Sequence, residues 1–137
     1  MINSYNNSTQ TVLTDGVLTF TVDRVKTGCT VTHAAGSTTF SLNRPGYYFV
    51  SFNADGGTTA TAGNVVLSLQ NNGVAVPGAI ATAYSAAAEN VSNLKFSAII
   101  QVRPACCVVS NATNLTVVNT GVGATLTNAN IVITKLA

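Results

Sequence analysis

Residues 44–53 read R-P-G-Y-Y-F-V-S-F-N, and this stretch decides the fold. A Pro-Gly pair breaks the backbone, and seven residues that favour extended structure follow it. Successive side chains of a strand point to opposite faces. One face carries Tyr48, Val50 and Phe52. The other face carries Tyr47, Phe49 and Ser51. An antiparallel strand with one face on the core and the other in water alternates apolar and polar residues. Aromatic residues on both faces therefore predict a central strand that is covered on both sides.

The second face of this strand predicts self-association. A chain of 137 residues is one domain by length, and its own core can cover only one side of the strand. Another copy of the chain would supply the second layer. We therefore expect Tyr47, Phe49 and Ser51 to lie in an interface between copies, where a tyrosine can bury its ring and keep a partner for its hydroxyl. The alternative is that these side chains face the opposite sheet of the same chain.

The composition predicts an all-β protein. Hydrophobic residues make up 47% of the chain and charged residues only 7%, against about a quarter in an average globular domain. So little charge disfavours both a disordered chain and a solvated helical one. The net charge of +2 comes from scattered residues, which argues against nucleic-acid binding through phosphates. No apolar run approaches the length of a membrane-spanning helix.

The alternation of apolar and polar residues predicts eight to ten short strands, and hence a sandwich or a barrel. Asn72-Gly73 lies between two such runs and predicts a tight hairpin, because both residues tolerate positive φ. Residues 54–64 read as a surface loop and 26–28 as a turn. In residues 78–90, an alanine-rich helix competes with a strand. The expected strands cover residues 18–22, 29–33, 38–42, 47–53, 65–70, 74–76, 94–103, 107–110, 115–119 and 131–136.

The order of these elements resembles the C1q/TNF-like family. The resemblance rests on Phe20, the run T-F-S-L at 39–42, P-G-Y-Y-F at 45–49, Asn72-Gly73 and the closing I-V-I at 131–133. It covers roughly residues 10–136. It implies an antiparallel jelly-roll β-sandwich at residues 11–137 that assembles as a homotrimer, preceded by a polar N-terminal arm at residues 1–10. The chain lacks the collagen-like Gly-X-Y stalk of that family and an evident acidic cluster for calcium.

Two segments, V-A-V-P-G-A at 74–79 and the closing I-V-I-T-K-L-A, resemble small C1q/TNF-like proteins of phages and prophages from Gram-positive gut bacteria. The resemblance implies a non-enzymatic virion protein, a trimeric capsid decoration or head-fibre protein assembled in the host cytoplasm. Its partners would be other virion proteins, the major capsid protein first. In the N-terminal arm, Ile2, Asn3 and Tyr5 are the candidate capsid-docking residues. The N-terminus also lacks the pattern of a secretion signal.

Two other functions remain open at this stage. The first is a receptor- or carbohydrate-binding module of a tail fibre, with a host-surface glycan held by the loops at 54–64 and 112–124 or by Tyr84. The second is a trimer of a bacterial surface or spore coat. Neighbouring genes would distinguish these functions. Capsid genes would favour a decoration protein, and tail-fibre genes would favour a binding module.

Catalytic and metal chemistry find little support in the sequence. His33 is the only histidine, and we expect it at a surface or interface, without an orienting carboxylate. Cys106 and Cys107 are adjacent and do not form a C-x-x-C motif. With Cys29 they would supply at most a three-thiolate site, and we expect all three to pack as small buried hydrophobes. We therefore predict no enzyme activity, no cofactor and no metal.

Overall fold

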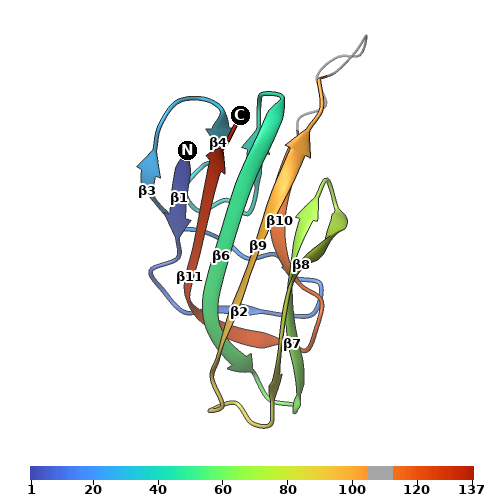
Figure 1. Ribbon diagram of the computed structural model, residues 1–137. Coiled ribbons are helices and arrows are strands. Elements are labelled where there is room, and N and C mark those ends of the chain that lie inside the picture. The colour runs from blue at the N-terminus through green and yellow to red at the C-terminus, as the bar shows by residue number, and fades with distance from the viewer. Residues whose placement is uncertain (105–112) are drawn as a thin grey trace.

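The computed structural model describes residues 1–104 and 113–137. Its strands form two antiparallel sheets that face each other (Figure 1). Sheet A runs in the order β3 (Val22–Lys26), β1 (Ile2–Tyr5), β11 (Ala124–Lys135), β6 (Gly46–Thr58) and β9 (Ser92–Val102), and β2 (Gln10–Val12) also pairs with β11. Sheet B runs in the order β4 (Val31–Thr32), β5 (Phe40–Leu42), β10 (Thr113–Asn119), β7 (Gly63–Asn71) and β8 (Val74–Ser85). In the described residues, no helix has the length and apolar character needed to span a membrane.

Strand β6 lies inside sheet A with a partner strand on each side, as the sequence predicts, and the cover expected over its second face stays a prediction. It pairs with β11 on one side and with β9 on the other, along almost its whole length. Tyr48, Val50 and Phe52 point into the sandwich and are buried. The Tyr48 hydroxyl donates a hydrogen bond of 2.6 Å to the Arg44 carbonyl. Burial raises the pKa of this phenol, which therefore stays neutral and keeps its proton for that bond.

The core lies between the two sheets and contains the expected aromatic residues. Phe20, Phe40, Phe52 and Phe96 are all buried. Phe20 lies edge-on to Phe40, with ring centroids 5.3 Å apart, and Phe52 stacks on Phe96 at 4.9 Å. Edge-to-face and offset contacts are the arrangements that aromatic rings prefer. The alternating pattern thus identified core residues even where the backbone is not a regular strand, as at Phe20.

The hairpin expected at Asn72-Gly73 is confirmed. It joins β7 to β8, and both turn residues have positive φ, 50° and 83°. The competing helix over residues 78–90 does not form, because β8 extends to Ser85 and pairs with β7. Long-range pairing decides this segment, and the helix propensity of its alanines is overridden.

Residues 1–10 are not a free arm. Residues 2–5 form β1, which lies between β11 and β3 in sheet A, and β2 begins at Gln10. Both partners of β1 are distant in sequence, so the local polarity of the segment gave no sign of the pairing. The Ile2 side chain is fully buried in the core, so it is unavailable for docking.

The loop expected at residues 54–64 is mostly strand. β6 continues to Thr58 and β7 begins at Gly63. Gly56 and Gly57 suggested a turn, but they lie in β6 where other parts of the chain come close to its backbone. A Cβ at Gly56 would overlap Leu126, and one at Gly57 would overlap the Asn90 carbonyl. Glycine inside a strand often marks such a contact. The strand expected at 115–119 is confirmed as β10, which occupies residues 113–119 of the 112–124 segment considered as a sugar-binding loop.

Two further expectations differ from the structure. The segment expected as a strand at 18–22 has no regular pairing before Val22, and Val17 just before it makes an isolated bridge to Val118. The regular strand is β3, which begins at Val22 and includes Lys26 of the expected turn. The described residues contain eleven strands, one more than the upper limit expected. The strand expected at 107–110 lies outside the described residues.

Candidate functional site

The outer face of sheet A carries the residues that the sequence singled out. Tyr47, Phe49 and Ser51 alternate with the buried residues of β6 and point away from sheet B. Tyr47 is 48% exposed, and Phe49 and Ser51 are half-buried. The alternative, in which these side chains face the opposite sheet, is therefore wrong. Their place in an interface between copies stays a prediction.

An apolar strip runs across this face beside Tyr47. The register places Phe49 between Ile99 of β9 and Thr134 of β11, and Val132 lies across from Ser51. Ile99 is 62% exposed although it is a large aliphatic residue. We define the apolar strip as Tyr47, Phe49, Ile99 and Val132. Sequence analysis missed Ile99 and Val132, because only the strand register shows that they are neighbours of Phe49.

The apolar strip continues over the edge of the sandwich. Ile99 also lines a cleft of about 300 Å³ between β9 and the start of β8. The other apolar residues of this cleft are Val74, Ala75, Val76, Pro77 and Ile100. One continuous apolar surface thus joins the middle of sheet A to the edge formed by β8 and β9.

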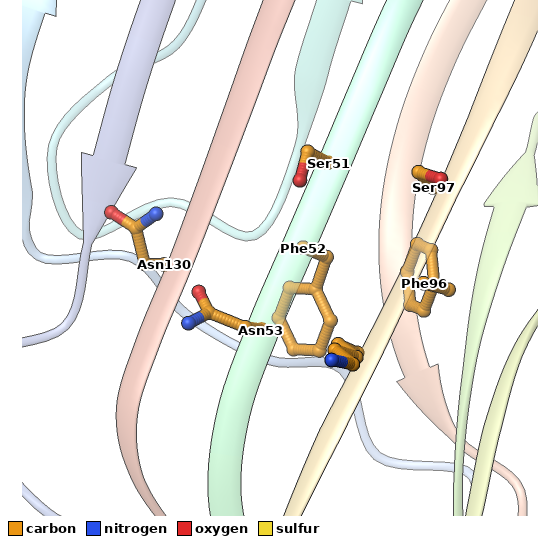
Figure 2. A pocket seen from close by; sticks show the side chains of 7 residues that line it. Ser51, Phe52, Asn53, Phe96, Ser97 and Asn130 are labelled. Atoms are coloured by element: carbon orange, nitrogen blue, oxygen red, sulfur yellow. The ribbon is translucent and has the colours of Figure 1, made fainter.

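The other half of the same face is polar. A shallow hollow of about 600 Å³ lies there, with side chains from β6, β9 and β11 around it (Figure 2). Its polar residues are Ser51, Asn53, Lys95, Ser97 and Asn130, and we name this set the amide hollow. Phe52 and Phe96 contribute to its floor, but their rings are buried in the core. The amide hollow therefore offers hydroxyls, amides and one ammonium, without an exposed aromatic platform.

A hydrogen-bonded carboxylate borders the amide hollow. Asp55 accepts bonds from the side-chain amides of Asn93, at 2.9 Å, and Asn128, at 3.1 Å. The Asn128 amide reaches it because β11 bulges between Thr127 and Asn130 and Asn128 takes a positive φ of 55°. These bonds, the one from Asn93 first, lower the pKa of Asp55 from its usual value of 3.8.

Asp55→Asn is expected to lower the thermal midpoint at neutral pH by about 2 °C and to have no effect in strong acid. The folded-state pKa is depressed, so the contribution of Asp55 is present above the unfolded value of 3.8 and is lost as the pH falls through the folded value. The effect is small because the carboxylate is largely solvated. Thermal midpoints measured from about pH 2 to pH 7 check this, with Glu89→Gln at an exposed position as the control. A pH-independent difference would contradict it.

The three predicted docking residues of β1 do not all lie on the same face of sheet A. Ile2 lies in the core, whereas Asn3 and Tyr5 lie on the outer face of sheet A. The Asn3 amide donates to the Asn130 side chain at 2.8 Å. The Arg24 guanidinium lies over the Tyr5 ring, 4.7 Å from its centroid, which is a cation–π distance. Asn3 and Tyr5 are therefore next to the amide hollow, and only these two are open to a partner.

His33 is buried, which corrects the expected surface position. Its side chain has no exposed area, and its Nδ1 lies 2.6 Å from the Asp23 carboxylate, the orienting group that sequence reasoning did not find. Ser4 also contacts Asp23 and not the ring, so these three residues do not form a nucleophile–base pair. A buried ring with both nitrogens bonded offers no base to a substrate.

Cys29 is exposed, so the expectation of a buried thiol is wrong for this residue. Cys106 and Cys107 lie outside the described residues. Among residues 1–104 and 113–137, no three His, Cys, Asp or Glu residues are grouped closely enough to hold a metal ion.

Comparisons with known proteins identify the fold. No protein-family model and no curated protein matches the sequence. Among solved structures, the crystal structure of murine APRIL at pH 5.0 is similar, with a TM-score of 0.63 over 98% of this chain and 97% of that chain. The two sequences are 11% identical, so the similarity concerns the fold. This chain is an antiparallel jelly-roll β-sandwich, similar in fold to that structure.

Proposed function

We propose that this protein is a non-enzymatic structural protein of a bacteriophage particle, a homotrimer on the virion surface that decorates the capsid or forms a head fibre. The observation that carries the proposal is the apolar strip on the outer face of sheet A, continued over the β8–β9 edge. Exposed apolar surface of this extent on a chain with so few charges favours a protein–protein contact.

The shape of this apolar surface favours a closed ring. It combines the outer face of sheet A with the neighbouring β8–β9 edge, so the face of one copy can pack against the edge of the next. A contact between the face of one copy and the edge of the next is heterologous. Such contacts form a closed ring when the rotation that relates neighbouring copies divides a full turn into a whole number of steps. The resemblance to C1q/TNF-like proteins favours three copies. Such a ring would bury Tyr47, Phe49 and Ile99 in every subunit.

The placement on a phage particle rests on the sequence. The segments V-A-V-P-G-A at 74–79 and I-V-I-T-K-L-A at the C-terminal end resemble small phage-encoded members of the family. The first of these segments forms the β8 start that lines the apolar cleft. A single compact sandwich with few charges suits a particle surface, where the protein acts through stable docking. The major capsid protein is the proposed partner.

Docking is proposed to use Asn3 and Tyr5, because Ile2 is in the core. Tyr5→Ala is expected to reduce occupancy on empty heads of a phage that encodes this chain by at least tenfold. Tyr84→Ala, at an exposed tyrosine on β8, is the matched control. Occupancy is measured by quantitative gel analysis of heads purified after mixing, with the native mass of each variant checked first. Equal occupancy of both variants would contradict this docking site.

The amide hollow favours one alternative, a carbohydrate-binding module on a tail fibre. Its amides and hydroxyls are groups that bind sugar hydroxyls, and Lys95 would favour an acidic sugar. The loops first considered for this role are largely strands, so the hollow replaces them as the candidate site. Binding to a glycan array that is lost in Lys95→Ala would support this alternative. Occupancy on heads without glycan binding supports the decoration protein.

A further inference from the structure

The His33 ring is enclosed at one edge of the sandwich, between the two sheets. It stacks on Phe40 of β5, with centroids 4.2 Å apart and planes 12° apart, and lies edge-on to Phe20. Its Nδ1 is 2.6 Å from Asp23 Oδ1, and its Nε2 is 3.0 Å from the Ser37 carbonyl. Each ring nitrogen thus has one polar partner, and no water is needed to satisfy either.

The partners determine where the ring protons are. A carbonyl oxygen only accepts hydrogen bonds, so Nε2 must carry a proton. Asp23 is surrounded by donors: the Ser4 hydroxyl donates to the same Oδ1 at 2.6 Å, and the Lys26 ammonium lies 3.8 Å from Oδ2. An ionised carboxylate accepts from all of these groups, and Nδ1 must then be the donor of its short bond.

We propose that His33 is a doubly protonated imidazolium in the folded protein, and that its pair with Asp23 is a proton-dependent clasp between the two sheets. Asp23 belongs to β3 at one edge of sheet A, and His33 directly follows β4 at the corresponding edge of sheet B. Lys26 of β3 reinforces the clasp, because its ammonium donates to the His33 carbonyl at 2.6 Å. This inference goes beyond the proposed function and holds for one copy or three.

The clasp requires a proton on each ring nitrogen and an ionised Asp23 carboxylate. A proton on Asp23 would remove the charge that balances the buried ring. A missing ring proton would leave a lone pair facing either the carboxylate or the Ser37 carbonyl. The charged groups that face the ring are Asp23 and Lys26, both from β3. The other side chains around it, those of Thr32, Ser37, Thr39 and Ser41, are uncharged.

Nitrogen NMR tests the charge state directly, and the only histidine of the chain makes the assignment unambiguous. In the uniformly ¹⁵N-labelled full chain at neutral pH, both ring nitrogens are expected to give signals of the protonated type. In Asp23→Asn, the asparagine amide can donate to Nδ1, so Nδ1 is expected to change to the unprotonated type. Asp55→Asn, which removes a carboxylate elsewhere on sheet A, is expected to leave both signals unchanged. An unprotonated ring nitrogen in the unsubstituted protein at neutral pH would overturn the proposal.

Hydrogen exchange tests the clasp. His33→Ala is expected to speed exchange of the β3 backbone amides about a hundredfold relative to Asp55→Asn, since it removes the buried ring that joins β3 to sheet B and leaves the partly buried Asp23 carboxylate without its closest cationic partner. His33→Lys restores a positive charge and is expected to recover part of that protection. Exchange rates of β3 that are equal in His33→Ala and Asp55→Asn would refute the clasp, whatever the charge state of the ring.

Discussion

Phe49→Glu is expected to convert the proposed trimer into a monomer of 14.0 kDa that keeps its fold. Phe49 lies in the middle of the apolar strip, between Ile99 and Thr134 of the neighbouring strands. In the proposed ring each copy would bury one carboxylate without a partner, at a cost of several kcal/mol per interface. In the monomer the same side chain points to solvent, so the sandwich itself tolerates it. Sedimentation or native mass spectrometry measures the change.

The control for this substitution is Thr82→Glu, which adds the same charge at an exposed position of β8. It is expected to retain the assembled mass. Circular dichroism of both variants separates loss of assembly from loss of fold. If Phe49→Glu keeps the mass of the unsubstituted protein, the apolar strip is not the interface.

Phe20→Ala is expected to lower the free energy of unfolding by about 3–5 kcal/mol. Phe20 is fully buried and lies edge-on to three aromatic rings, those of Phe40, Phe52 and His33. It also anchors a segment without regular strand pairing, which is held by packing and by single backbone hydrogen bonds such as the one from the Gly36 N–H to the Phe20 carbonyl, at 2.8 Å. Truncation leaves a cavity where both sheets contribute side chains. Urea unfolding at one fixed protein concentration measures the loss, because the proposed assembly would make stability depend on concentration.

Leu13→Ala is the matched control, since Leu13 is an exposed residue of the stretch that leads to Phe20. It is expected to change the free energy of unfolding by less than about 0.5 kcal/mol. A loss below about 1 kcal/mol for Phe20→Ala would mean that the aromatic cluster is not the centre of the core.

The sequence predicted those features that local patterns control. Alternation in residues 47–52 gave the correct inward and outward faces of β6, and Asn72-Gly73 gave the β7–β8 hairpin. Both signals depend on neighbours within a few residues. The all-β class and the sandwich follow from many such short patterns, and the resemblance added the jelly-roll arrangement.

Features that depend on distant partners were missed. β1 looked like a polar arm because its partners β3 and β11 lie far along the chain. His33 looked isolated because Asp23 reaches it only after the sheets form. Gly56 and Gly57 looked like a turn because the groups that exclude a side chain there are Leu126 and Asn90. Local alternation predicted the outward direction of the candidate residues on β6, whereas their neighbours on β9 and β11 required the register.

The native mass of the purified protein, measured with and without reductant, tests assembly most directly. The account predicts three times 14.0 kDa in both conditions, because the apolar strip and the β8–β9 edge hold the ring without any contribution from the exposed thiol of Cys29. A stable mass of 14.0 kDa at micromolar concentration would contradict the account, since the apolar face of sheet A would then be exposed to water without a partner.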